Sequence, residues 1–190
     1  MNVEKLSISS LLLLQPKRFG DNRGYFMESY NSETLFQEVG LDTVFVQDNE
    51  SYSALAGTVR GLHLQAPPYA QGKLVRCSSG RITDIVVDVR EGSPTYGHSE
   101  SVEISAANHK QIWVPPGFLH GFVTLERGTC VQYKTTAPYN PDSARSVYWA
   151  DPDLNLDWGI SAEDAILSEA DKDAGGFKNF KSGFNISSED

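Results

Sequence analysis

The alternation of apolar and polar positions between Val44 and Thr136 predicts a series of short strands. Apolar residues recur at every second position in runs that Gly, Pro and Asn separate, and no run with helical spacing intervenes. Many short strands at regular spacing are typical of a sandwich or barrel, and a double-sheet jelly roll closes such a chain compactly. We therefore expect an all-β fold with strands at residues 44–49, 57–65, 73–79, 81–89, 96–104, 111–115, 119–125 and 129–136.

The N-terminal part of the sequence predicts short strands and one helix. Residues 1–30 contain extended runs, and the cluster Phe19–Gly24 predicts a turn. A helix follows, since Asn31 or Ser32 can cap it and Gly40 can end it. The apolar stripe of this helix consists of Leu35, Phe36 and Val39.

After Pro141 the alternation stops and turns dominate the sequence. Residues 161–167 and 168–174 each predict a helical turn, and the polar residues 181–190 predict a frayed tail. At 190 residues, with no linker and no internal repeat, the chain predicts one domain over residues 1–190.

Composition and charge narrow the class of protein. The net charge of −9 argues against a nucleic-acid-binding protein, although a basic pocket can still lie within an acidic surface. No apolar run is long enough to span a membrane, and Leu11–Leu14 after Glu4 is too short for a signal peptide. Cys77 and Cys130 lack metal-ligand spacing. We expect a cytoplasmic protein that binds neither nucleic acid nor membrane.

Two neighbouring predicted strands concentrate basic and titratable side chains. Arg60 and His63 lie in the first, and Lys73 and Arg76 in the second. Such a set suits a pocket for an anionic substrate with a titratable base in it. A core histidine with a hydrogen-bond partner, beside exposed basic residues, explains this stretch equally well. Strict alternation places Gly61, His63 and Gln65 on one face, and Arg60, Leu62 and Leu64 on the other.

A second informative stretch runs from Trp113 to Phe122. Its Pro-x-Gly-x-x-His pattern, which ends at His120, resembles the second motif of the cupin superfamily of jelly-roll barrels. Cupins that bind metal generally offer His-x-His in their first motif, whereas here Gln65 stands two residues after His63. Two imidazoles are a poor ligand set for zinc or iron. We therefore expect a barrel without metal, whose histidines are available for acid–base chemistry.

Motifs along most of the chain resemble, in order, those of the dTDP-4-dehydrorhamnose 3,5-epimerase family of cupins. They extend from about residue 15 to residue 173 and lie at residues 19–28, 46–49, 59–65, 71–75, 114–122, 133–136 and 151–154. The resemblance implies a cupin-type double-stranded β-helix (a jelly-roll barrel) with a few short helices. It also implies a homodimer in which N-terminal strands cross to the partner, a dTDP-4-keto-6-deoxy sugar as substrate, and no cofactor.

The resemblance implies a catalytic role for each matched residue. His63 would be the general base, and Tyr133 the general acid on the opposite face of the sugar. Asp171 would pair with His63 and raise its basicity, and Lys73 would stabilise the enolate at the C4 oxygen. Other candidates for the partner of His63 are Asp173 and Asp84.

The same resemblance implies a set of substrate-binding residues. They are Arg23, Arg60 and His120 for the diphosphate and sugar, Glu28, Gln47 and Asn49 for the nucleoside, and Tyr139 for stacking on the thymine. In a homodimer, Arg23 and Glu28 would act in the site of the partner.

These residue types suit proton removal next to a ketone, followed by reprotonation from the other side. The 4-keto group acidifies the hydrogens at C3 and C5, because the carbanion is delocalised onto oxygen as an enolate. Histidine is the side chain whose ordinary pKa lies nearest neutrality, and a carboxylate behind it favours the imidazolium that forms. Lys73 can stabilise the enolate, and Tyr133 can donate a proton from the opposite face. This chemistry requires no redox cofactor, metal or Schiff base.

Three positions depart from the family pattern. Pro138, Ala144 and Ala170 stand where the family commonly has Tyr, Glu and Lys. They leave open a narrower enzyme that inverts only C3 or only C5, in antibiotic or surface-polysaccharide biosynthesis. The motifs around His63 and Tyr133 argue against a related 3,4-ketoisomerase, and the intact catalytic set argues against a non-catalytic binding protein.

Overall fold

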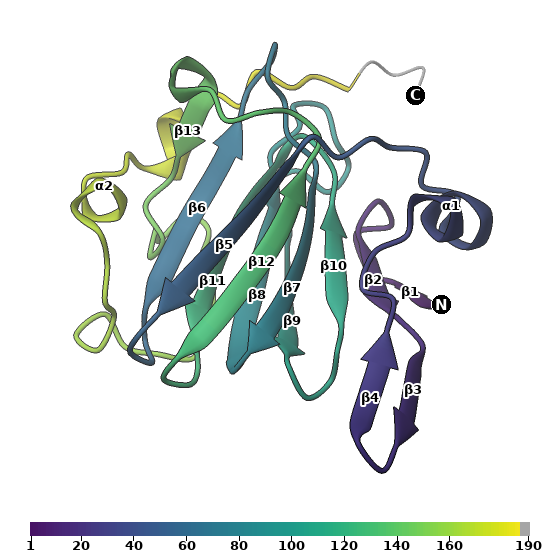
Figure 1. Cartoon of the computed structure of the whole chain (residues 1–190). Helices are drawn as coiled ribbons and strands as arrows, with labels where there is room; N and C mark the ends of the chain where they lie inside the picture. Colours follow the sequence, from purple (N-terminus) through teal and green to yellow (C-terminus); the bar gives the residue numbers. More distant parts are fainter. Residues whose placement is uncertain (187–190) are drawn as a thin grey trace.

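Two antiparallel sheets form the body of the molecule (Figure 1). The structure is a computed structural model that describes residues 1–186. The six-stranded sheet has the order β1 (Asn2–Lys5), β2 (Leu12–Gln15), β10 (Gln111–Val114), β7 (Lys73–Ser79), β12 (Thr129–Thr135) and β5 (Gln47–Ser53). The five-stranded sheet has the order β13 (Ala144–Ser146), β6 (Val59–Gln65), β11 (Phe118–Thr124), β8 (Arg81–Asp88) and β9 (Ser99–Ser105). The predicted all-β fold with two sheets is therefore confirmed.

A separate hairpin and short helical segments complete the chain. In the hairpin, β3 (Arg18–Asp21) pairs with β4 (Gly24–Met27). The helical segments are α1 (Ser32–Thr34), the π-helix η1 (Leu35–Val39), the 3-10 helices η2 (Pro141–Ser143) and η3 (Phe177–Asn179), and α2 (Glu169–Lys172). No helix within residues 1–186 is long and apolar enough to cross a membrane.

Apolar side chains are buried on both faces of β8. Ile82 and Val86 pack in a cluster to which both sheets contribute, so this cluster fills the space between them. Ile85 and Val87 belong to a second cluster, which includes Trp149 and other residues of the C-terminal region. The C-terminal region therefore covers the outer face of the five-stranded sheet.

The side chains of β6 do not alternate as the sequence predicts. Arg60 and His63, predicted on opposite faces, line the same cavity. The reason is a bulge, because Gly61 and Leu62 stand opposite the single residue Gly121 in the pairing with β11. Gly61 has a φ of 121°, and a Cβ there would lie 2.6 Å from the Cα of Gly121. The strands approach too closely at this point for any side chain.

The predicted helix at residues 31–40 is present as α1 followed directly by η1. The side-chain oxygen of Asn31 caps it by accepting hydrogen bonds from the backbone N–H groups of Glu33 and Thr34. Gly40 ends it with a left-handed φ of 74°. The predicted burial of Phe36 is wrong, since this residue is 52% exposed. The wider π-helical turn changes the spacing of the side chains and turns Phe36 outward.

Strand predictions between residues 44 and 136 are confirmed with shifted ends, and the C-terminal predictions are mixed. The helical turn predicted at residues 168–174 is present as α2, whereas residues 161–167 form turns and a β-bridge. Ile166 pairs with Thr58 in that bridge, and its extended backbone excludes a helical turn. The predicted fraying is wrong for residues 181–186, because Ser182 is buried and Asn185 forms a β-bridge with Glu91. Residues 187–190 of the predicted tail lie outside the described part of the chain.

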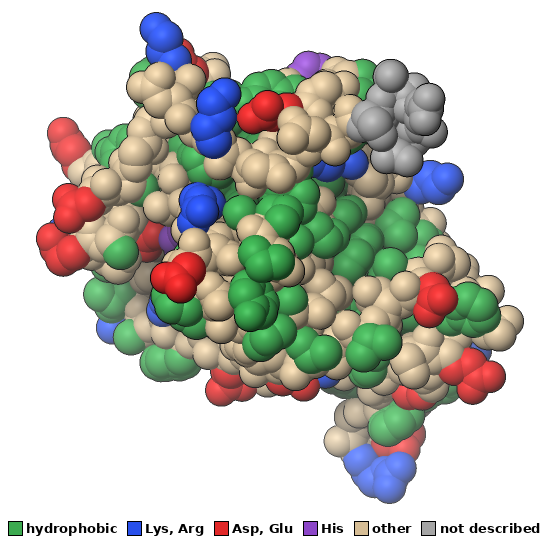
Figure 2. Space-filling model, turned by 90° about the horizontal axis from the view of Figure 1, so that it is seen from above, with side chains coloured by type: hydrophobic (Ala, Val, Ile, Leu, Met, Phe, Trp, Pro, Cys, Tyr) green, Lys and Arg blue, Asp and Glu red, His purple; other side chains and the backbone are tan. Residues whose placement is uncertain are grey.

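The β3–β4 hairpin projects from the body of the molecule (Figure 1). Its aromatic side chains Phe19, Tyr25 and Phe26 are 54%, 55% and 67% exposed. The predicted turn at Phe19–Gly24 is shorter than expected, because Phe19–Asp21 belongs to β3. Hydrophobic side chains also gather across the centre of one face of the molecule (Figure 2). Exposed apolar groups of this extent are typical of surfaces that contact another protein.

Candidate active site

A cavity of about 850 Å³ lies between the two sheets. Strands β6, β11 and β13 contribute residues from one sheet, and β5, β7 and β12 contribute residues from the other. Residues 166–171, which lead into α2, close one side. The cavity brings together seven of the residues predicted from the sequence, namely His63, Tyr133, Asp171, Lys73, Arg60, His120 and Tyr139.

His63 and Asp171 form a hydrogen-bonded pair at the edge of this cavity. Nε2 of His63 lies 2.6 Å from Oδ1 of Asp171. The second carboxylate oxygen accepts a hydrogen bond of 2.7 Å from the hydroxyl of Ser168. Ser168 is also the N-cap of α2, where its oxygen accepts from the backbone N–H of Asp171. The first turn of α2 thus fixes the carboxylate behind the imidazole.

The charge state of Asp171 determines which ring nitrogen of His63 can act as a base. Burial raises the pKa of Asp171, but hydrogen bonds from His63 and Ser168 outweigh this effect and lower the pKa. An ionised carboxylate accepts the Nε2–H of the ring, so Nδ1 carries the free lone pair of the neutral imidazole. His63 is about half exposed to the cavity, and this nitrogen is available to a substrate.

Lys73 is a buried cation beside His63. Its Nζ donates a hydrogen bond of 3.3 Å to the backbone carbonyl of His63. Burial lowers the pKa of Lys73 to about 8, and the negative charge of Asp84 partly opposes this shift. Lys73 is therefore mostly protonated at neutral pH and loses its charge in mildly alkaline solution.

Tyr133 faces the cavity from the wall opposite His63, because β12 belongs to the six-stranded sheet and β6 to the five-stranded sheet. Burial raises the pKa of Tyr133, and the positive charge of Arg60 offsets part of this shift. The phenol stays protonated at neutral pH and can donate its proton. A base and an acid therefore stand on opposite walls of one cavity.

His120 extends the polar lining of the cavity toward the interior of the barrel. Its Nε2 lies 2.8 Å from Oδ2 of Asp84, a side chain that is completely buried. Asp84, considered above as an alternative partner of His63, therefore pairs with His120. Asp173, the other alternative, follows the end of α2 and does not line the cavity, because the helix turns Asp171 inward.

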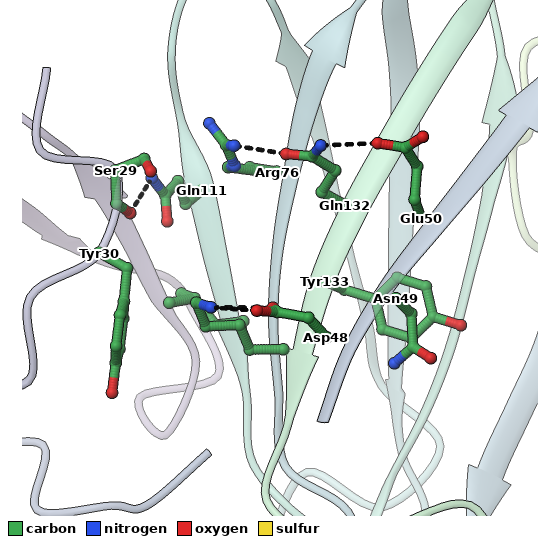
Figure 3. Close-up of a pocket in the computed structure, with 11 residues that line it drawn as sticks. Ser29, Tyr30, Asp48, Asn49, Glu50, Arg76, Gln111, Gln132 and Tyr133 are labelled. Atoms are coloured by element: carbon green, nitrogen blue, oxygen red, sulfur yellow. Dashed lines mark hydrogen bonds and ion pairs between the residues drawn. The ribbon is translucent and has the colours of Figure 1, made fainter. Parts of the chain in front are cut away.

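A smaller cavity of about 360 Å³ adjoins the first one, and Glu50 and Tyr133 line both. Figure 3 shows its polar wall on β5, β7 and β12, where Arg76 donates to Gln132 and Gln132 donates to Glu50. Asn49, predicted to contact the nucleoside, lines this smaller cavity.

Gln47 links the two predicted nucleoside contacts that lie near the cavities. Its side-chain amide donates a hydrogen bond of 2.7 Å to Asn49, and its Oε1 accepts from the backbone N–H of Tyr139. Tyr139 is 64% exposed and lines the larger cavity. These three residues therefore form one hydrogen-bonded group that connects the linings of the two cavities.

Arg23 and Glu28 lie away from both cavities within residues 1–186. Arg23 is at the tip of the β3–β4 hairpin, where its side chain is 85% exposed and pairs with Asp21. This pairing raises the pKa of Arg23. Glu28 follows β4 and accepts a hydrogen bond from Asn31. These two residues face solvent in the single chain.

Sequence reasoning missed several residues that line the larger cavity. Among them are Glu50, Tyr52, Gln71, Arg145 and Ser168. Their signals in the sequence are weak, because each is an ordinary polar residue in a strand or turn. The described residues 1–186 contain no group of three or more His, Cys, Asp or Glu side chains that could hold a metal ion.

Comparison with known proteins identifies the family. The sequence profile of dTDP-4-dehydrorhamnose 3,5-epimerases matches residues 5–179. The chain belongs to this family. It is 50% identical over 171 residues to the dTDP-4-dehydrorhamnose 3,5-epimerase of Sinorhizobium fredii, across 90% of this chain and 87% of that protein. Its fold is the cupin-type β-fold of the family.

Two solved structures show the extent of the similarity. The 3,5-epimerase of Legionella pneumophila in complex with dTDP-4-keto-L-rhamnose is 37% identical, with a TM-score of 0.92 and coverage of 98% of both chains. A 3'-monoepimerase of Streptomyces bikiniensis in complex with dTDP-quinovose is 32% identical, with a TM-score of 0.84 and coverage of 90% of this chain and 86% of that one. Both an enzyme named for two carbons and one named for a single carbon therefore share this fold.

Proposed function

We propose that this protein epimerises dTDP-4-dehydro-6-deoxy-D-glucose at C3 and C5 to dTDP-4-dehydro-L-rhamnose, a step of dTDP-rhamnose biosynthesis, without a cofactor. The observation that carries the proposal is the placement of the His63–Asp171 pair and Tyr133 on opposite walls of one cavity. Inversion of a carbon requires a base on one face of the sugar ring and an acid on the other. The similarity to 3,5-epimerases at up to 50% identity supports the same activity.

The reaction begins with removal of the proton next to the 4-keto group. Nδ1 of His63 takes this proton, and the electron pair moves onto the ketone oxygen as an enolate. Asp171 stabilises the imidazolium because its charge lies 2.6 Å from the ring. Lys73 stabilises the enolate oxygen with its positive charge. Tyr133 then donates its proton to the carbon from the opposite face, which inverts the centre.

Basic groups of the cavity account for the binding of a diphosphate by an acidic protein. Arg60 lines the cavity without a carboxylate partner among the described residues, so its guanidinium is available for charge-assisted hydrogen bonds. His120 lines the same space. The hydrogen-bonded group of Tyr139, Gln47 and Asn49 then suits stacking on the thymine and polar contacts with the nucleoside.

The protein acts, in this proposal, as a cytoplasmic homodimer that exchanges its β3–β4 hairpin, since β2 pairs with β1 and β10 of its own chain. The exposed aromatic groups of the hairpin and its projection from the body support a partner surface. Arg23 and Glu28 then reach the cavity of the partner, where Arg23 contacts the diphosphate and Glu28 the nucleoside.

Proton exchange in deuterated water tests the reaction directly. The protein is incubated with dTDP-4-dehydro-6-deoxy-D-glucose, and the signals of the C3 and C5 hydrogens are followed by NMR. Loss of both signals with formation of the L-configured keto sugar is the expected result. Binding without any exchange would contradict the enolate mechanism for this substrate.

A single-centre epimerase is a second candidate, which the similarity to enzymes named 3,5-epimerases does not favour. Ala144 and Ala170 line the cavity with methyl groups in place of Glu and Lys. Without charged groups at these two positions, the wall offers fewer polar contacts that orient the sugar for a second inversion. Exchange at C3 alone, or at C5 alone, would identify this enzyme.

Mixing two defective variants tests the exchange of Arg23 between subunits. His63→Asn removes the base, and Arg23→Ala removes the hairpin cation. A mixed dimer contains one site with both residues intact if Arg23 acts in the partner, so activity should appear when subunits are allowed to exchange. Equal inactivity before and after mixing, with mixed dimers detected by native mass spectrometry, would place Arg23 in its own subunit.

A further inference from the structure

The barrel contains a second histidine–carboxylate pair, which the reaction described above does not use for proton transfer. Asp84 lies on β8 and is completely buried. Its Oδ2 is 2.8 Å from Nε2 of His120, which lies on the neighbouring strand β11 and lines the cavity. Asp84 therefore stands behind His120 as Asp171 stands behind His63.

The buried carboxylate of Asp84 lowers the stability of the fold. Its Oδ1 has no hydrogen-bond partner among residues 1–186, and leaving a buried polar atom unsatisfied costs about 1–3 kcal/mol. Ile82 and Val86, on the same face of β8, pack in the apolar cluster between the sheets. An apolar residue at position 84 would continue this cluster without an unpaired oxygen. Such a group points to a role in the site rather than in folding.

The charged and titratable side chains nearest Asp84, Lys73 and His120, both line the cavity. Burial lowers the pKa of Lys73 to about 8, and the charge of Asp84 opposes that shift from across the barrel. His120 contacts the carboxylate directly. The other charged or titratable side chains that line the cavity are Glu50, Tyr52, Arg60, His63, Tyr133, Tyr139, Arg145 and Asp171.

We propose that Asp84 is a positioning residue for the reaction inferred above: it holds Nε2–H of His120 away from the cavity and presents Nδ1 to an oxygen of the bound sugar nucleotide. A carboxylate that accepts from one ring nitrogen fixes the tautomer and the orientation of the imidazole. When Nδ1–H also donates to an anionic oxygen of the substrate, the ring carries a positive charge, which Asp84 compensates. The inference rests on the proposed function.

Asp84→Asn tests this role, and Asp88→Asn is its matched control. Both aspartates lie on β8 and are completely buried. Asp88, however, is held by Arg90, Ser93 and Thr95 outside the cavity. We expect Asp84→Asn to lower kcat/KM by about 10–100-fold and to move the alkaline limb of the pH profile to lower pH, since Lys73 loses a neighbouring negative charge. Asp88→Asn should lower Tm and leave the pH profile unchanged.

A second measurement does not depend on turnover and is made on the wild-type protein, with one variant used only for assignment. Proton–nitrogen NMR spectra of protein labelled with 15N-histidine show which ring nitrogen of His120 carries a proton, with His120→Asn for the assignment. We expect a protonated Nε2 in the wild type and a chemical-shift change at Nδ1 on addition of dTDP. An unprotonated Nε2, or an Asp84→Asn variant that behaves like Asp88→Asn in kinetics, would overturn the proposal. A wild type with a protonated Nε2 but no proton exchange would instead contradict the epimerase and leave Asp84 as a binding determinant.

Discussion

Asp171→Asn removes the charge behind His63 with little change in shape. The carboxylate is 4% exposed, so little solvent surrounds it. Its Oδ1 lies 2.6 Å from Nε2 of His63. The amide keeps one acceptor oxygen but carries no charge, so the imidazolium formed by proton abstraction faces a neutral group. We expect a slower chemical step and nearly unchanged substrate binding.

The size of the effect follows from the geometry. Opposite unit charges 2.6 Å apart attract each other by about 6 kcal/mol at an effective dielectric constant near 20. His63 is about half exposed, and solvent screening reduces this attraction. A remaining contribution of about 3 kcal/mol corresponds to a loss of roughly 100-fold in kcat.

Deuterium exchange at C3 and C5 of the keto sugar measures this step without interference from product release. Ser168→Ala is the control, because it removes a hydrogen bond to Asp171 but leaves the charge, and it should cost less than about tenfold. Asp171→Asn with a kcat within about threefold of the wild type, and an unchanged circular dichroism spectrum, would refute an electrostatic role for the carboxylate.

Three further predictions concern other buried groups. Activity should fall as the pH rises through about 8, because Lys73 loses its charge there. Values of kcat/KM between pH 6 and 10 measure this decrease, and the Lys73→Arg variant should not show it. Tyr133→Phe should slow inversion by about 100-fold or more, yet NMR should still detect exchange of the substrate protons, since His63 remains as the base. Asp88→Asn should lower the free energy of unfolding by about 3 kcal/mol in urea denaturation, because Arg90 loses its buried partner. Burial raises the pKa of Asp88, but hydrogen bonds from Arg90, Ser93 and Thr95 outweigh this effect and lower the pKa to about 2. The contribution of Asp88 is therefore present above pH ~4 and should be lost as the pH falls through about 2.

The strands and the catalytic candidates could be predicted from the sequence because their signals are local. Period-two alternation in β8 is visible within a few residues, and Ile82 and Val86 pack on one face of the strand while Ile85 and Val87 pack on the other. The helix before Gly40 has its capping residue and its terminating glycine within one short segment. The short motifs around His63 and Tyr133 likewise identify each candidate catalytic side chain. Their similarity to the dTDP-4-dehydrorhamnose 3,5-epimerase family indicates proton transfer next to a ketone.

Tertiary structure decided how these groups meet. His63 and Asp171 are 108 residues apart along the chain, and only folding shows that this aspartate, rather than Asp84, accepts the hydrogen bond. The bulge at Gly61 places Arg60 in the cavity against the alternation of the sequence, because the pairing with β11 is a long-range contact that no local pattern encodes. The sequence by itself therefore determined the strands and the reactive side chains, whereas the partner of each and the wall it faces depend on contacts between distant segments.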